Sequence, residues 1–125
     1  MTSRIFGSGI RRKEDPRLIT GKASYTDDVK LPGMVHAAIL RSPHAHARIG
    51  GIDTGAALAA PGVLAVYTGA DTEGALSPIP CAWLVPDSDI KPVPYLAIAK
   101  DVVRYVGEAV AVVVAEDRYR AEDAL

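Results

Sequence analysis

The sequence predicts a small α+β fold of short strands and short helices. Two apolar segments, residues 34–41 and 108–115, contain no proline or glycine and are typical of buried strands. Acidic and hydroxyl side chains precede alanine-containing stretches near residues 54 and 117, as they do at helix starts. A length of 125 residues fits one domain.

The composition excludes several classes of protein. Hydrophobic residues make up 49% and charged residues 23% of the chain, which indicates a globular rather than a disordered protein. No stretch approaches the roughly 20 apolar residues of a membrane span, and the N-terminus lacks the apolar core of a signal peptide. The single cysteine, Cys81, cannot form an internal disulfide, and we expect a reducing, cytoplasmic setting.

Charge is distributed unevenly along the chain. Residues 1–50 hold nine Lys/Arg and four Asp/Glu, a net charge of +5, whereas residues 51–125 hold five and eleven, a net charge of −6. This asymmetry is typical of a docking face or of solvated charges on opposite surfaces. The overall charge of −1 and only seven aromatic residues predict no nucleic-acid partner.

In the first half of the chain, residues 1–14 are predicted to be an N-terminal arm, and residues 15–125 the folded domain. Asp15-Pro16 begins a single helical turn over 15–20, which Gly21 can end in a left-handed conformation. A well-buried strand is expected over 34–41, broken by Ser42-Pro43. Residues 44–52 alternate between polar and apolar, which predicts a half-buried strand with a bulge at Gly50-Gly51.

In the second half, Asp53 or Thr54 caps a helix over 55–60, and a strand follows over 63–67. Residues 69–96 contain five of the nine prolines and are expected to form a long loop that includes Cys81 and Trp83. Residues 95–99 are expected to form a short strand and residues 101–106 are ambiguous. Gly107 then makes a turn before the central strand 108–115. Asp117 caps a last helix, 118–125, and because no C-cap signal follows, we expect the chain to be truncated there.

The histidines offer the most specific hint of chemistry. On a strand, His44 and His46 would face the same way, but zinc or copper needs at least one further ligand, which His36 or Asp53 could supply only if the fold brought them close. Ser42 and His44 are near each other in sequence, yet no G-x-S-x-G turn is present. Surface or interface histidines are the simpler interpretation.

Other patterns are weaker. Gly21-Lys22-Ala23-Ser24 has Pro16 where a phosphate loop has its first glycine, and Gly7-Ser8-Gly9 follows no strand. The pairs Glu116-Asp117 and Glu122-Asp123 are typical of helix ends and solvent-facing positions rather than of an acid–base pair. The residues therefore predict no catalytic, cofactor-binding or metal-binding side chain in this chain.

Three blocks carry a resemblance to a known family. They are Arg12 to Asp28 followed by 31–36 (RKEDPRLITGKASYTDD…LPGMVH), Arg41 to Ile49 followed by 61–66 (RSPHAHARI…PGVLAV), and Val106 to Tyr119 (VGEAVAVVVAEDRY). In this order the chain resembles the start of the large subunit of the xanthine dehydrogenase, aldehyde oxidase and carbon monoxide dehydrogenase family. One departure is Ala109, where related chains often have proline, and a larger one is that the family's large subunit is several times longer.

The resemblance implies an α/β hammerhead domain, a mixed β-sheet with a few short helices. It also implies a molybdenum hydroxylase, which oxidises a carbon centre or carbon monoxide at a molybdopterin-type molybdenum cofactor, with electrons leaving through iron–sulfur clusters to FAD on partner domains or subunits. The family's cofactor loops and glutamate base lie far downstream, so no such residue is carried over. The expected partners are the remainder of the large subunit and the iron–sulfur and flavin modules, and the fragment alone is expected to be inactive.

Two alternatives remain at this point. The chain could be a stand-alone interaction module that reuses the same fold, with the charge asymmetry and the proline-containing loop as its binding face. It could also be a small metal-binding protein that uses His44 and His46.

Overall fold

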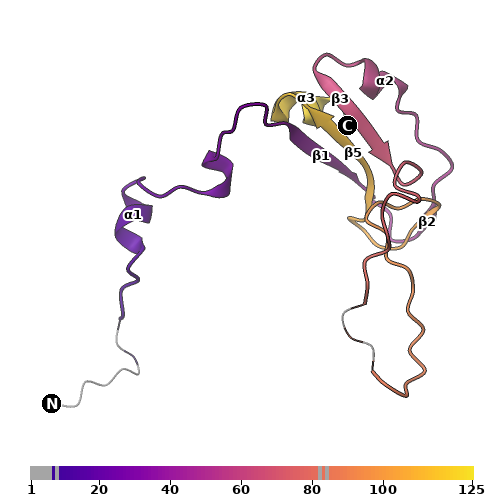
Figure 1. Ribbon diagram of the computed structural model, residues 1–125, viewed down its shortest axis with the longest axis horizontal. Helices are drawn as coiled ribbons and strands as arrows, with labels where there is room; N and C mark the ends of the chain where they lie inside the picture. The colour runs from indigo at the N-terminus through magenta and orange to yellow at the C-terminus, as the bar shows by residue number, and fades with distance from the viewer. Residues whose placement is uncertain (1–6, 8, 82, 84) are drawn as a thin grey trace. The chain divides into compact units, whose positions relative to one another are not determined.

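The computed structural model describes residue 7, residues 9–81, residue 83 and residues 85–125 (Figure 1). The chain divides into two compact units, Met1–Gly33 and Met34–Leu125. The predicted boundary between an arm and a domain near residue 15 stays a prediction. Within the described residues, no helix combines the length and the apolar character that a bilayer crossing requires.

In its described residues, 7 and 9–33, the first unit contains one helical turn and one 3-10 turn. Helix α1 spans Asp15–Ile19 and carries Pro16 in its first turn. The helix begins at Asp15, as predicted, and its N-cap is Glu14, whose side chain makes no capping bond. Gly21 has a φ of 69°, which confirms the left-handed end that was predicted for this turn. The 3-10 turn η1 spans Thr26–Asp28, and the Asp28 carboxylate accepts a 2.8 Å hydrogen bond from the Tyr25 backbone N–H.

The second unit is organised around a three-stranded sheet (Figure 1). Its strands are β1 (His36–Arg41), β5 (Ala109–Ala115) and β3 (Val63–Thr68), in the order β1-β5-β3. Both pairings are antiparallel, with irregularities at Leu40/Arg41 and at Val63/Ala65. The predicted central strand is therefore confirmed. Strand β1 is less buried than expected, because Ala38 is its one buried residue.

A second, shorter ladder pairs β2 (Ala47–Arg48) with β4 (Val102–Val103), again antiparallel. The prediction of a strand over all of 44–52 is wrong, since only two of its residues are in a ladder. Alternation alone was a poor guide here because alanine and histidine have little strand propensity and the only partner is two residues long. The predicted strand 95–99 is also wrong: Tyr95 makes one isolated bridge with Ile79.

Two short helices accompany the sheet. Helix α2 spans Gly55–Ala59, and the Asp53 carboxylate accepts a 2.9 Å hydrogen bond from the Gly55 N–H just before it. Helix α3 spans Arg118–Asp123, and Asp117 caps it by accepting a 2.9 Å bond from the Arg120 N–H, as predicted. Both helices end before the predicted residues 60 and 125.

The packed centre of the second unit is built from small side chains. Ala38 of β1, Ala115 of β5 and Ala121 of α3 are 3%, 0% and 1% exposed, and Val63 packs against them. Because alanine has no side chain beyond Cβ, α3 can lie close to the strands. The expected α+β fold of a small sheet with short helices is confirmed, with the refinement that the pairings of the described strands are all antiparallel.

The segment between β3 and β4 is a long loop, as predicted (Figure 1). Turns follow β3 up to Leu76, and the bridge between Ile79 and Tyr95 closes the base of the part that follows. Trp83 lies in this part and is 77% exposed, and the Cys81 thiol donates to its carbonyl at 3.1 Å.

Gly69 marks a close approach of two backbone segments, and this predicts a stability effect. A Cβ at this position would lie 2.4 Å from the Ala99 carbonyl oxygen and 2.7 Å from the Lys100 Cα. Backbone atoms cannot rotate away, so we expect Gly69→Ala to lower the free energy of unfolding by roughly 1–3 kcal/mol, as overpacking does. Denaturant unfolding would measure the change.

Gly51→Ala is the matched control, because a Cβ there meets nothing within 4 Å. Its unfolding should stay within about 0.5 kcal/mol of the parent, as for surface substitutions. Equal effects of the two substitutions would contradict the close approach at Gly69.

Candidate functional site

The sheet of the second unit has one closed and one open face. Along β5, Ala111, Val113 and Ala115 are buried on the side that carries α3. The alternate residues Val110, Val112 and Val114 point to the other side and are only partly buried. Their neighbours across the ladders on this side are Ile39 of β1 and Tyr67 of β3, both opposite Val112, and these are 41% and 48% exposed.

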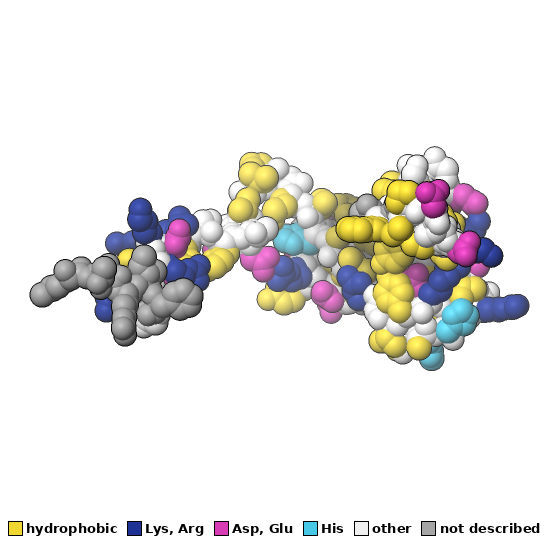
Figure 2. Space-filling view, turned by 90° about the horizontal axis from the view of Figure 1, so that it is seen from below, with side chains coloured by type: hydrophobic (Ala, Val, Ile, Leu, Met, Phe, Trp, Pro, Cys, Tyr) yellow, Lys and Arg dark blue, Asp and Glu magenta, His cyan; other side chains and the backbone are white. Residues whose placement is uncertain are grey.

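We name this surface the open sheet face and define it by Ile39, Tyr67, Val110, Val112 and Val114. Large apolar side chains left half-exposed on adjacent strands mark a surface that another protein segment covers. Hydrophobic side chains are gathered on the second unit in the space-filling view as well (Figure 2). The open sheet face is therefore the first candidate for a functional surface.

A shallow hollow of about 320 Å³ lies at one edge of the open sheet face. Tyr67 and Val112 belong to its wall, and the turn after β3 contributes Ala75 and Leu76. Its lining is almost wholly apolar, with Asp71 and Thr72 as the polar side chains. Such a hollow suits an apolar side chain of a partner segment better than a charged substrate.

Asp71 stabilises the turn that forms the wall of this hollow. Its carboxylate accepts two 2.7 Å hydrogen bonds from Thr68, one from the hydroxyl and one from the backbone N–H. The hydroxyl and then the backbone bond lower the pKa of Asp71 below its ordinary value of 3.8. The carboxylate thus acts as a structural acceptor at the end of β3.

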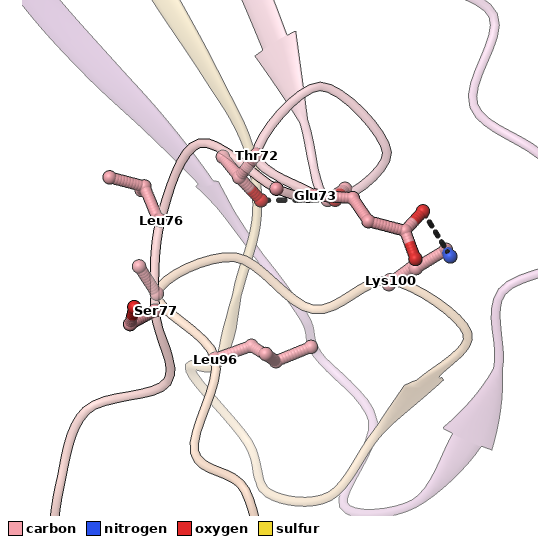
Figure 3. Close-up of a pocket in the computed structure, with 9 residues that line it drawn as sticks. Thr72, Glu73, Leu76, Ser77, Leu96 and Lys100 are labelled. Atoms are coloured by element: carbon pink, nitrogen blue, oxygen red, sulfur yellow. Dashed lines mark hydrogen bonds and ion pairs between the residues drawn. The ribbon is translucent and has the colours of Figure 1, made fainter.

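A more polar pocket of about 140 Å³ lies beside the same turn (Figure 3). The Lys100 ammonium group and the Glu73 carboxylate form a 2.6 Å ion pair on its rim, and Leu76 and Leu96 supply apolar walls. The hydrogen bond to Glu73 raises the pKa of Lys100, with burial opposing it. Because the two charges satisfy each other, the pair ties the turn to the Lys100 segment and leaves no free general base.

The residues singled out for chemistry are not assembled for it. His46 lies in a bend and His44 in irregular backbone, so neither is on a strand and the argument that they face the same way fails. The Ser42 hydroxyl, which is largely buried, donates to the His44 carbonyl at 3.1 Å and accepts from the His44 N–H at 3.0 Å. Its partner is thus backbone and not imidazole. Among the residues that the structure describes, no group of three or more His, Cys, Asp and Glu side chains is placed to hold a metal ion.

The glycine-containing segments and the acidic pair before α3, which were weaker candidates for chemistry, have structural roles where the structure describes them. Gly21 ends helix α1, and the segment Gly7-Ser8-Gly9 lies partly outside the described residues, at Ser8. Glu116 and Asp117 both form ion pairs with Arg120 at the start of α3, which agrees with the predicted helix-terminal role.

Two features of the second unit were missed from the sequence. Glu108 is 4% exposed, and its carboxylate accepts the backbone N–H of Arg104. Around it, Ser42 N–H donates to the Glu108 carbonyl at 2.9 Å, and the Arg41 guanidinium donates to the Gly107 carbonyl at 2.9 Å. The second feature is a ring contact between Tyr95 and Tyr105. The only signal for Glu108 was a charge directly before an apolar strand, which we interpreted as a strand start.

Comparison with known proteins settles the relationship. Residues 20–125 match the family model described as "Aldehyde oxidase and xanthine dehydrogenase, a/b hammerhead domain". This chain belongs to that family. The α/β hammerhead fold expected from the three sequence blocks is thereby confirmed.

Relatives of the hammerhead chain share much of its sequence. It is 47% identical over 124 residues to the nicotine 6-hydroxylase large subunit of Paenarthrobacter nicotinovorans, covering 99% of this chain and 15% of the relative. It is 45% identical over 125 residues to the carbon monoxide dehydrogenase large chain of Afipia carboxidovorans, covering 98% and 14%.

Solved structures agree with this placement. Quinoline 2-oxidoreductase from Pseudomonas putida 86 superimposes with a TM-score of 0.80 at 47% identity, over 94% of this chain and 15% of that one. The chain thus spans about 15% of the length of the proteins that it matches.

The turn held by Asp71 yields a pH-dependent prediction. We expect Thr68→Val to raise the pKa of Asp71 toward 3.8, because the hydroxyl bond is the main cause of its lowering. A carboxyl whose pKa is lowered on folding contributes stability above its unfolded pKa, and this stability is lost as pH falls through the folded pKa. The variant should therefore lose less stability on acidification than the parent. Side-chain carboxyl NMR titration would give the pKa directly.

Thr72→Val serves as the control, since the Thr72 hydroxyl donates to the Gly69 carbonyl at 3.0 Å rather than to Asp71. The Asp71 titration should be the same in this variant as in the parent. An Asp71 pKa unmoved by Thr68→Val would show that the hydroxyl bond is not the cause of the lowering.

Proposed function

We propose that this chain is the N-terminal assembly domain of a molybdenum hydroxylase large subunit. The observation that carries the proposal is the open sheet face, which leaves Ile39 and Tyr67 exposed next to partly buried valines. Such a face suits a domain that packs against the rest of a larger subunit. The family match and the 15% span of the relatives support the same conclusion.

Energetics favour covering this face. Burial of apolar surface contributes about 25 cal/mol per Å², or roughly 1.5–3 kcal/mol for one large side chain. Two half-exposed large side chains and the adjoining 320 Å³ hollow offer such a gain to a matching segment. The remainder of the large subunit is the proposed covering partner.

The proposed enzyme uses a molybdopterin-type molybdenum cofactor, which supplies the oxidation of a carbon centre or of carbon monoxide. Relatives bear names such as "Xanthine dehydrogenase molybdenum-binding subunit". We propose that the remainder of the large subunit holds this cofactor. Iron–sulfur and flavin modules are the further proposed partners. The exposed, unpaired Cys81 supports a reducing, cytoplasmic location.

The role proposed for this domain predicts no turnover by the 125-residue chain alone. The chain is expected to oxidise neither purines nor aldehydes. The reading frame beyond Leu125, determined from the source DNA, is expected to continue for the rest of a large subunit. A stop codon directly after Leu125 would overturn the proposal in favour of a stand-alone interaction module.

The assembly role is tested by substituting a residue of the open sheet face in the full large subunit, which the continued reading frame would encode. Ile39→Asp places a carboxylate where apolar burial is required, and desolvating a charge at an interface is costly. We expect the yield of assembled, molybdenum-containing complex to fall about 10-fold or more, equivalent to at least 1.4 kcal/mol. Size-exclusion chromatography and metal analysis of the purified complex would measure it.

Ile19→Asp is the matched control, because Ile19 is 84% exposed on α1 and is not part of the open sheet face. Unfolding of the 125-residue chain should be similar for both variants, which separates assembly from folding. Normal assembly of the Ile39→Asp subunit would refute this role for the open sheet face.

A further inference from the structure

Two tyrosines from different parts of the second unit meet at the base of the long loop. The ring centroids of Tyr95 and Tyr105 are 6.2 Å apart and the ring planes are inclined by 16°. Their phenol oxygens are hydrogen-bonded to each other. The side chains therefore meet at their hydroxyl ends.

Backbone bonds hold both rings in place. The Tyr95 carbonyl accepts a 2.8 Å hydrogen bond from the Ile79 N–H, in the bridge that closes the loop. The Tyr105 carbonyl accepts a 3.3 Å bond from the Glu108 N–H across the turn at Gly107. Each tyrosine thus projects from backbone that is hydrogen-bonded in place.

The contact with Tyr95 favours the protonated form of the Tyr105 phenol. The hydrogen bond with Tyr95, followed by burial, raises the pKa of Tyr105 to about 12; the charges of Tyr95 and Glu108 also raise it, and that of Arg41 lowers it. The neutral phenol loses an electron and a proton together on oxidation, and the adjoining phenol oxygen is a ready acceptor for a hydrogen bond during that loss.

We propose that Tyr95 and Tyr105 form a site of intramolecular dityrosine coupling for one-electron oxidants of the peroxidase and hydrogen peroxide class. Each phenol loses one hydrogen atom to give a phenoxyl radical, and hydrogen peroxide takes up the two electrons and two protons to give two waters. A carbon–carbon bond then forms between the ring carbons next to the two oxygens. The hydrogens on those carbons move to the oxygens and restore both phenols.

The product geometry agrees with the arrangement in the structure. In a ring-to-ring link of this kind, the two oxygens sit on carbons that adjoin the new bond, so they must be neighbours in the product. Tyr95 and Tyr105 already have neighbouring oxygens and nearly parallel rings. Coupling therefore requires the rings, whose centroids are 6.2 Å apart, to approach each other further.

Other tyrosines of the chain are at least as exposed but lack this arrangement. Tyr25, Tyr67 and Tyr119 are 59%, 48% and 82% exposed, against 46% for Tyr95 and 39% for Tyr105. Within the residues that the structure describes, the Tyr95–Tyr105 contact is the only aromatic pair recorded. If exposure alone decided, Tyr119 would couple with a tyrosine of another chain. The geometry instead favours coupling of Tyr95 with Tyr105 within one chain. The link would tie the loop base at Tyr95 to the turn before β5.

Oxidation of the dilute 125-residue chain tests the site. The chain at about 10 µM is treated with a peroxidase and hydrogen peroxide, the monomer is isolated, and dityrosine fluorescence and cross-linked peptides are measured. Because tethered groups reach effective concentrations in the millimolar range, coupling within the chain should exceed coupling between chains about 100-fold. The expected product is a monomer in which the peptides of Tyr95 and Tyr105 are joined.

Tyr95→Phe should lower the dityrosine signal of the monomer by on the order of 10-fold or more, because one radical partner is lost while the ring is kept. Tyr119→Phe, which alters the most exposed of the described tyrosines, should leave the monomer signal unchanged. Circular dichroism would verify that both variants are folded. Dityrosine found only in covalent dimers, or an undiminished monomer signal in Tyr95→Phe, would overturn the proposal.

Discussion

The packing of β5 against α3 is the constraint on which the second unit depends. Among the described strands, β5 is the one with a partner on both edges. Its register with each partner therefore fixes the position of β1 relative to β3, on the opposite edge. Ala115 at its end and Ala121 of α3 are almost completely buried. A larger side chain at either position would push the helix away from the sheet, because a closely packed interior cannot absorb extra volume. The close approach of α3 therefore follows from the smallness of these residues.

The small size of these core residues also limits how much apolar surface the domain can bury. Among the described residues, no large side chain is fully buried, and the core consists mainly of alanine and valine. Small domains already bury a lower fraction of their surface than large ones do. The closed face with α3 thus holds the sheet in shape, while the open sheet face retains the apolar area that a neighbouring segment can use. Folding relies on one face of β5, and the proposed assembly would use the opposite face.

The elements that could be predicted from the sequence are those determined by local physics. The uninterrupted apolar run of β5 favours a central strand of a sheet, and Asp117 followed by Arg118 to Asp123 supplies a cap and a short helix. Residues 44–52 were mispredicted because strands are stabilised by cross-strand partners, and only Ala47 and Arg48 find any in β4. The alternation of histidine and alanine carried no information about that partner.

The parts of the candidate surfaces that escaped prediction depend on tertiary contacts. The burial of Glu108 depends on the turn at Gly107, which brings its carboxylate to the N–H of Arg104 just after β4. Its carbonyl at the same time accepts the Ser42 N–H at the end of β1. One residue thus joins the short ladder to the three-stranded sheet, and a buried carboxylate is tolerable there because the backbone N–H of Arg104 donates to it. Tyr105 lies in this same turn, so the geometry that holds Glu108 also sets the ring against Tyr95. The turn around Gly107 therefore connects the base of the long loop, at Tyr95, to the central strand β5.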